Sequence, residues 1–166
     1  MAYADYDFYT TSYYGSVVPG GDFLRLAQRA SDFIDTITYG NLRNGLPTDE
    51  YSLDRLKKAV CAVAEKMYDL ELAERNATNA AMSSNEMVTV GANGKSTGIV
   101  TSVSSGSESI SYATPQQIGA SAKEWSAVYA AAGDIQKTND LLLKTALPLL
   151  MGVRTDDGIP ILYAGV

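Results

Sequence analysis

The chain has 166 residues with 46% hydrophobic and only 19% charged side chains, a net charge of −6 and no histidine. This length predicts one domain able to bury its own core, and the acidic balance excludes the basic patch that tight binding of DNA or RNA requires. The single cysteine excludes a disulfide framework within the chain and a cysteine zinc site, and the sequence has neither a secretory signal nor a membrane-spanning window, so we expect a cytoplasmic protein.

Residues 1–18 combine aromatic side chains with small and acidic ones. Such a segment is too polar for a core strand and too aromatic for a disordered tail, so we expect an extended arm that lies on a surface. Tyrosine is favoured where one end of the ring is buried and the other is wet. The alternative is an arm packed on its own helices. The side chains expected to be buried across subunit contacts are Tyr3, Tyr6, Phe8, Tyr9, Tyr13 and Tyr14.

Residues 19–82 predict two helices. In the first, over about 21–39, apolar residues recur at three- and four-residue spacing, which is one face of a helix. Pro19 precedes its start, and Gly40 is the expected residue after its C-terminal cap.

The second helix has the stronger pattern. Thr48 can cap it, and acidic residues follow near its positive end. An apolar stripe continues as far as Leu72, and the helix could reach Ala80. Cys61 lies on this helix in an apolar setting, where a lone thiol is usually a small hydrophobic side chain.

Residues 83–113 change character, because glycine, serine, threonine and β-branched residues replace alanine and leucine. Short alternating segments at 87–90, 98–103 and 109–112 are separated by glycine-containing turns, which predicts a β-hairpin or meander inserted between helices. Such an insertion either projects from the body to meet a partner or packs as a small sheet on the helices, and the sequence leaves both open.

Residues 114–152 return to helical periodicity. Thr114 opens a capping box at the start of a third helix, which Gly133 interrupts. A further helix begins at Ile135, and Pro148 is expected to bend it. The expected fold is therefore mainly α: an antiparallel bundle of three to four helices with a small β-hairpin or meander insertion and extended N- and C-terminal arms, in one domain.

Residues 153–166 form an apolar tail in which no charged residue follows Asp157. A free terminus frays unless its own domain or a neighbour holds it, and Pro160 suits an extended edge rather than a helix. We expect this tail to pack on its own domain or on a neighbouring molecule. The side chains expected to dock are Ile159, Ile161, Leu162, Tyr163 and Val166.

No catalytic constellation is recognisable in the sequence. Without histidine, a Cys/His pair and the usual serine triad are impossible. Gly91-Ala-Asn-Gly-Lys-Ser-Thr97 resembles the end of a phosphate-binding loop, but Thr89 stands where that motif needs glycine, and a strand-like segment follows. The pair Asp156 and Asp157 is typical of a turn, with a weak cation site as the alternative. We therefore expect no enzyme, no cofactor and no metal site.

Four segments carry a resemblance to a known family. They are Thr-Ser-Tyr-Tyr-Gly at 11–15 with Phe-Leu-Arg-Leu-Ala-Gln-Arg-Ala-Ser-Asp-Phe-Ile-Asp at 23–35, Leu-Lys-Lys-Ala-Val-Cys-Ala-Val-Ala-Glu at 56–65, the serine-rich stretch ending in Ser-Tyr-Ala at 99–113, and Ile-Leu-Tyr-Ala-Gly-Val at 161–166. In this order they resemble the head–tail connector proteins of tailed bacteriophages and prophages. Residues 114–150 show less likeness, and 83–98 form a longer stretch than that family's pattern has.

The resemblance implies a structural virion protein of the neck, assembled in the bacterial cytoplasm. Such adaptors form a ring, commonly of twelve copies, that docks beneath the portal protein, extends the DNA channel and offers an attachment surface to the next neck or tail-terminator protein. DNA would pass through without specific binding, which suits an acidic wall that repels phosphates. The alternatives are a small helical enzyme or ligand-binding domain with a site between helices, and a cellular protein–protein interaction module.

Overall fold

The computed structural model describes residues 2–83, 99–104, 109–113 and 126–162 of the chain. The described part is mainly helical, as the sequence predicts. Its elements, in chain order, are α1 (Tyr6–Thr11), α2 (Gly20–Ile37), α3 (Glu50–Ser83), β1 (Ile99–Ser104), β2 (Ser109–Ala113), α5 (Ala127–Ala131) and α6 (Ile135–Leu150).

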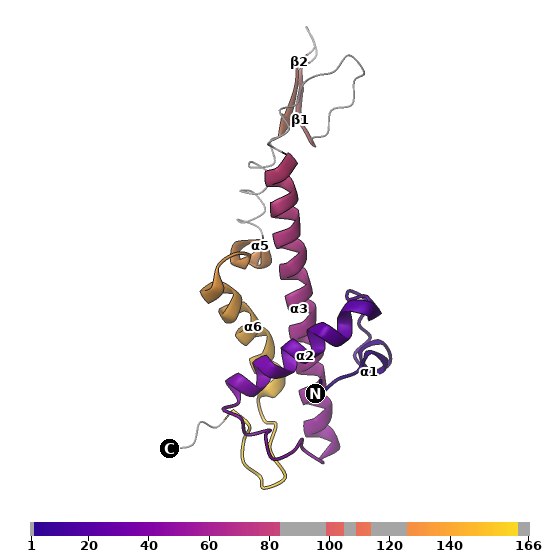
Figure 1. Ribbon diagram of the computed structural model, residues 1–166, viewed down its shortest axis with the longest axis vertical. Coiled ribbons are helices and arrows are strands. Elements are labelled where there is room, and N and C mark those ends of the chain that lie inside the picture. Colours follow the sequence, from indigo (N-terminus) through magenta and orange to yellow (C-terminus); the bar gives the residue numbers. More distant parts are fainter. Residues whose placement is uncertain (1, 84–98, 105–108, 114–125, 163–166) are drawn as a thin grey trace.

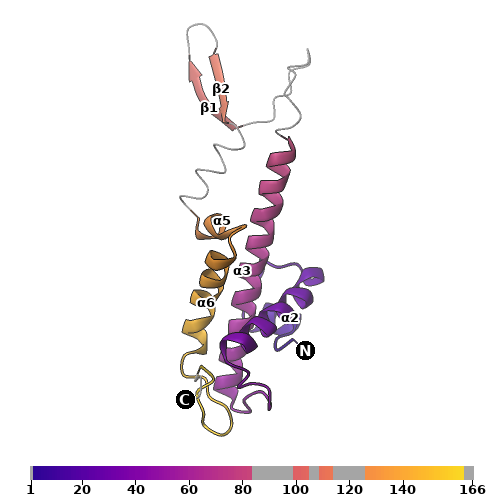
Figure 2. The same ribbon diagram turned by 60° about the vertical axis from the view of Figure 1, so that its left-hand side comes forward.

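Helix α3 is the long central element around which the molecule extends (Figure 1). Residues 59–64 are all buried, so this stretch of α3 is covered on every side, as expected for a helix that is apolar all round. Helix α2 crosses α3 obliquely, whereas α6 packs along it (Figure 2). The Arg55 guanidinium near the start of α3 donates to the carbonyl oxygen of Leu149 near the end of α6 at 2.9 Å, so these two helices run antiparallel.

Helix α2 packs with the apolar face that its periodicity predicts, but its C-terminal end differs from the prediction. The helix ends at Ile37 and Thr38 is its cap, so the following residue is Tyr39 rather than Gly40. Tyr39 has a φ of 56°, in the left-handed region that a tyrosine rarely adopts, and Gly40 follows with a φ of 72°. Two consecutive residues in the left-handed region therefore follow the cap of α2. The fully buried side chains of α2 are Phe23, Leu26, Ala27, Ala30, Ser31 and Ile34.

The start of α3 uses a different cap from the expected Thr48. The Asp49 carboxylate accepts a hydrogen bond from the backbone N–H of Ser52 at 2.9 Å, which satisfies one of the free donors in the first turn. This bond holds the pKa of Asp49 below its ordinary value. Thr48 instead donates through its backbone N–H and its hydroxyl to Asp156, at 2.8 and 3.0 Å. The segment before α3 is thereby attached to the loop that follows α6.

Strands β1 and β2 pair antiparallel, with Val100 opposite Tyr112, and the register shifts between Val100 and Ser102. The hairpin lies beyond the C-terminal end of α3, at the opposite end of the molecule from the start of α3 (Figures 1 and 2). The strand expected at 87–90 and the capping box expected at Thr114 lie outside the described residues.

Helix α6 matches the helix predicted from Ile135. Asp134 caps this helix, because its carboxylate accepts hydrogen bonds from the backbone N–H groups of Lys137 and Gln136. These hydrogen bonds lower the pKa of the Asp134 carboxyl. Gly133, with a φ of 80°, separates α6 from the short α5, as expected for the interruption at this glycine. Pro148 lies inside the last turn of α6.

Candidate subunit and partner interface

The N-terminal segment is not an extended arm, because residues Tyr6–Thr11 form α1. The Asp5 side chain accepts from the backbone N–H of Phe8 at 2.8 Å and so caps this helix. Tyr9 is fully buried against α2, with its ring centroid 4.5 Å from that of Phe23. The expectation that Tyr9 is buried across a subunit contact is therefore wrong: its ring belongs to the core of its own chain.

The hydroxyl groups of three tyrosines attach this segment to the larger helices. Tyr9 donates to one oxygen of Glu65 at 2.8 Å and Tyr13 donates to the other at 3.2 Å, both on α3. Tyr3 donates to Asp35 of α2 at 2.6 Å. Burial first, and then the neighbouring carboxylate, raises the pKa of Tyr3 and of Tyr13 above the ordinary tyrosine value. These phenols are therefore neutral donors at any physiological pH.

The remaining aromatic residues of the segment differ in exposure. Phe8 is half-buried beneath Lys57, whose Nζ lies 5.2 Å from the ring centroid. Tyr6 is exposed on one side while its ring packs 5.7 Å from that of Phe23. Tyr14 is 83% exposed and has a φ of 58°. Of the six aromatic residues expected at a subunit contact, Tyr6 and Tyr14 are the two with rings most available to a partner.

The C-terminal tail also folds back on its own chain. Residues 153–161 form a tight hairpin-like loop, in which the N–H of Ile161 donates to the carbonyl oxygen of Val153 at 3.1 Å. Ile161 and Val153 are both buried in the core, and Asn41 donates to the carbonyl oxygen of Ile161 at 3.0 Å. The assignment of Ile161 as a docking residue is therefore wrong.

The other residues of the expected docking surface differ in their exposure. Ile159 is exposed at the far side of the loop, and Leu162 is partly buried against the core. Tyr163 and Val166 lie outside the described residues. The turn expected at Asp156 and Asp157 is present, and the Asp156 carboxylate binds Thr48 rather than presenting both oxygens to a cation.

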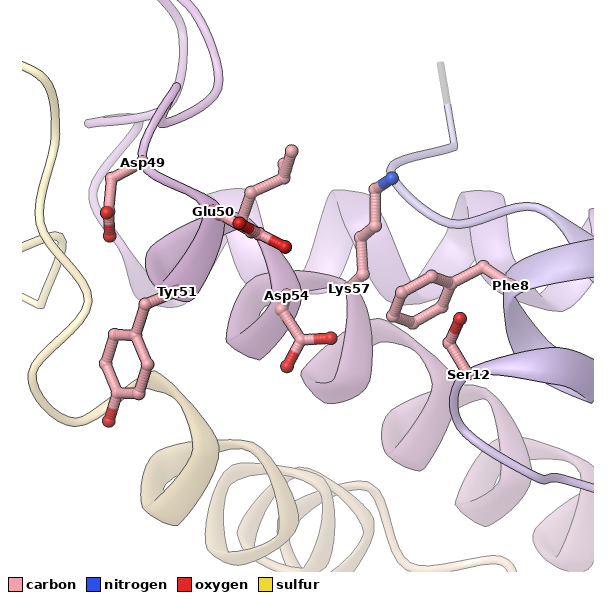
Figure 3. Close-up of a pocket in the computed structure, with 8 residues that line it drawn as sticks. Phe8, Ser12, Asp49, Glu50, Tyr51, Asp54 and Lys57 are labelled. Carbon is pink, nitrogen blue, oxygen red and sulfur yellow. The ribbon is translucent and has the colours of Figure 1, made fainter.

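An open groove of about 620 Å³ lies between α1 and the first two turns of α3 (Figure 3). Phe8 and Ser12 form one wall, and Asp54 and Lys57 face them from α3. Two of its charged groups are already engaged: Asp54 pairs with Lys58 at 2.7 Å, and Lys57 lies over the Phe8 ring. The groove is wide and shallow rather than enclosed, so it lacks the concave apolar enclosure of a small-molecule site. The residues around it are Phe8, Ser12, Asp49, Glu50, Tyr51, Leu53, Asp54 and Lys57.

A cluster of ion pairs joins α2 to the middle of α3. Glu71 accepts from Arg25 through both carboxylate oxygens, at 2.7 and 2.8 Å, and from Arg29 at 2.6 Å. Arg75 lies 3.7 Å from the same carboxylate. These bonds, with that of Arg25 first, lower the pKa of Glu71 and raise that of Arg25. The acidic Glu71 and Asp22 offset much of the arginine charge, so the cluster is a link between helices rather than a basic patch.

Cys61 behaves as the sequence predicts for a lone core thiol. It is buried on α3, and burial raises the pKa of its thiol to about 12. Within the described residues, no three acidic, cysteine or histidine side chains are close enough to hold a metal ion. None of the described helices combines the length and apolar character that crossing a membrane would need.

Sequence reasoning missed the apolar side chains that the fold leaves exposed outside the termini. Leu24 on α2, Tyr51 on α3 and Met151 after α6 are 67%, 61% and 65% exposed. The signal for Leu24 was available, because it stands next to Phe23 on the side of α2 that the polar residues occupy. Tyr51 and Met151 lie at helix ends, where periodicity alone does not distinguish an exposed residue from a buried one.

Comparisons of the chain with models of known protein families, with curated proteins and with solved structures found no significant match. The candidate site is a surface. It consists of exposed apolar residues on α1, α2, α3 and α6, on a body whose two ends are formed by the β1–β2 hairpin and the 153–161 loop.

Proposed function

We propose that this chain is the subunit of a head–tail connector, an adaptor ring in the neck of a tailed-phage virion. The ring would dock beneath the portal protein, extend the DNA channel and present a surface to the next neck or tail-terminator protein. Two things support the proposal. Four segments of the sequence resemble that family in the right order, and the folded chain leaves apolar surface exposed that a partner would cover.

The exposed apolar surface is the observation that carries the proposal. Single exposed apolar residues are ordinary on a monomer. Here Tyr14, Leu24 and Met151 are each about two-thirds exposed or more, and Ile135 is 80% exposed, on a chain with only 19% charged residues. These four side chains are available to a partner, and a subunit would cover such side chains where it contacts its neighbours in an assembly.

The elongated shape supports contacts with different partners at the two ends. The β1–β2 hairpin lies at one end, and the 153–161 loop with the exposed Ile159 lies at the other (Figure 1). We assign the hairpin to contact with a neighbouring neck component. The loop and the residues that follow it, which include Tyr163 and Val166, are assigned to the portal or to an adjacent subunit.

The charge pattern supports a channel that does not hold DNA. Non-specific affinity for duplex DNA requires several lysine or arginine contacts to phosphate, each of which releases counterions. In this chain the densest group of arginines, Arg25, Arg29 and Arg75, is bound to Glu71, and the net charge is −6. The purified protein is therefore expected not to shift duplex DNA at physiological salt, and a salt-dependent shift at micromolar protein would contradict the proposed channel.

The decisive experiment is the mass of the particle, measured by native mass spectrometry with and without the portal protein of the same phage or prophage. A closed ring on the portal, commonly of twelve copies in the resembling family, is the expected result. Deleting residues 163–166 keeps the buried Ile161 and should weaken portal binding while circular dichroism stays unchanged. If the chain neither binds the portal nor assembles, the proposal is wrong, and a monomeric ligand-binding domain is favoured.

A further inference from the structure

The connection between α2 and α3 contains an asparagine followed directly by a glycine, Asn44 and Gly45. It lies at the end of the molecule where α3 begins and where the 153–161 loop is found (Figure 1). Both residues are exposed. Among the described residues, no group forms a hydrogen bond with the Asn44 side chain, so its amide is free to turn toward the backbone that follows it.

The backbone nitrogen of Gly45 is weakly held and unshielded. The Gly45 φ of 141° suits glycine and would strain other residues, and a side-chain carbon placed on it would meet no atom within 4 Å. The N–H donates to the carbonyl oxygen of Leu42 at 3.2 Å, which is the long limit for such a bond. Within the described part of the chain, one weak hydrogen bond at the surface is therefore what holds this nitrogen.

We propose that Asn44 is a site of spontaneous deamidation through a cyclic imide. The Gly45 nitrogen gives up its proton to water and attacks the side-chain carbonyl carbon of Asn44. The new C–N bond closes a five-membered ring, and the side-chain nitrogen leaves as ammonia after taking up a proton. Water, the only co-reactant, then adds to one of the two ring carbonyls and breaks its C–N bond. Opening at the former side chain gives aspartate, and opening at the former peptide bond gives isoaspartate.

The structure distinguishes Asn44 from other asparagines of the described chain. Asn41 donates through its side-chain amide to the carbonyl oxygen of Ile161 at 3.0 Å, so its amide is already engaged. Asn139 is exposed but lies inside α6, where the N–H of the following residue belongs to the hydrogen-bond ladder of the helix. Attack by that nitrogen would require the helix to open first, whereas the nitrogen after Asn44 requires the loss of one long bond.

The exposed pair Asp157 and Gly158 has a similar sequence but a less reactive geometry. The N–H of Gly158 donates to the carbonyl oxygen of Thr155 at 2.8 Å, which is shorter than the bond made by Gly45. An ionised carboxylate is also a poorer electrophile than a neutral amide. Ring closure at this turn should therefore be slower than at Asn44.

Deamidation at Asn44 changes the charge of the loop and leaves the core in place. Each event makes the net charge one unit more negative than −6. The aspartate product keeps the backbone unchanged. The isoaspartate product lengthens the main chain by one carbon between the buried residues Leu42 and Pro47, and this change falls in the exposed part of the loop. The protein should accumulate as folded charge isoforms, whether or not it has the proposed function.

The test follows the full chain at mildly alkaline pH, folded in buffer and unfolded in urea, by mass spectrometry of tryptic peptides. Trypsin cleaves after Arg43 and Arg55, so peptide 44–55 contains Asn44 as its only side-chain amide. Deamidation raises the mass of this peptide by about 1 Da, and chromatography separates its isoaspartate and aspartate forms. The peptide should convert in the folded protein at a rate within about tenfold of the rate in urea, because one surface hydrogen bond has to open.

The internal control is peptide 138–144, which contains the exposed Asn139 and should not convert in the folded protein. Asn44→Gln should leave peptide 44–55 unmodified, because its longer side chain closes the imide ring far more slowly. Absence of isoaspartate from peptide 44–55 would overturn the proposal, and so would a folded-state rate more than about tenfold below the rate in urea. A product confined to peptide 76–95, which contains the other Asn–Gly pair at 93–94 outside the described residues, would also overturn it.

Discussion

The Tyr9 hydroxyl forms three hydrogen bonds, one that attaches the N-terminal segment to α3 and two within that segment. It donates to Glu65 at 2.8 Å, and it accepts from the backbone N–H groups of Val17 and Val18, both at 3.0 Å. The Tyr9→Phe substitution keeps the ring and its packing on Phe23 but removes all three bonds. It therefore isolates the polar contribution of this one atom from the burial of the aromatic ring.

The magnitude follows from what the substitution leaves behind. The bond to Val18 is buried, so its N–H would have no partner and no access to water. A buried unsatisfied donor costs about 1–3 kcal/mol, and a lost hydrogen bond to a charged group about 1.5–3 kcal/mol in full. Glu65 keeps Tyr13 as a donor, which reduces the second amount. We expect the free energy of unfolding to fall by about 3 kcal/mol, which for a chain of this size lowers Tm by about 6–12 °C.

The assay is urea unfolding followed by circular dichroism, with Tyr13→Phe as the matched variant. Tyr13 donates to the same carboxylate at 3.2 Å from a half-buried position, and no backbone donor depends on it in the described structure. The Tyr13→Phe substitution should lower the free energy of unfolding by about 1 kcal/mol or less. Equal losses for the two variants would refute the reasoning, because the difference between them measures the buried backbone donors. A decrease in the free energy of unfolding below about 1 kcal/mol for Tyr9→Phe would also refute the reasoning.

Three further predictions concern other parts of the fold. Asp156→Ala removes two hydrogen bonds between the 153–161 loop and the chain before α3 and should lower the free energy of unfolding by about 1 kcal/mol, whereas Asp157→Ala beside it should change nothing measurable in the same urea titration. Cys61 should react with a maleimide only after unfolding, because it is buried with a raised pKa; equal rates for native and unfolded protein would contradict its burial. The pKa of Glu71 is lowered in the folded state, so the ionised carboxylate contributes fully to the free energy of unfolding above its ordinary pKa of 4.5, and this contribution is lost as the pH falls through the folded pKa. The free energy of unfolding of Glu71→Gln should therefore fall less between neutral and acid pH than that of the unaltered chain.

Helices α2 and α6 could be predicted from the sequence because each buries one face. Period and capping residues placed α2 and α6 within a few residues of their observed bounds. The start of α3 was harder, because Thr48 and Asp49 are both good caps in isolation. The choice between them depends on Asp156, which is more than a hundred residues away in the sequence and bonds to Thr48. A local pattern contains no information on such a partner.

The candidate surface was predicted less well, because tyrosine composition does not say which surface the rings cover. The sequence indicated that the tyrosine rings of the N-terminal segment have one buried and one polar end, which holds for the half-buried Tyr3 and Tyr13 but not for the fully buried Tyr9 or the exposed Tyr14. It did not indicate that Glu65 and Asp35 of the same chain accept from their hydroxyls. The signal that was available is the Asp5 cap, since aspartate three residues before Phe8 favours a helix over an extended arm.

Both terminal segments pack on their own body, which changes how an assembly of this chain can form. If the tyrosines of the N-terminal segment packed only on a neighbouring copy, each copy would fold fully only on binding and would lose conformational entropy at that step. With Tyr9 and Ile161 already buried, copies in the proposed ring would associate as folded bodies, and their contact would be limited to side chains that remain exposed. In the proposed ring, the portal would hold several copies side by side and raise their effective concentration, so that contacts too weak to hold two copies together in dilute solution would still close the ring.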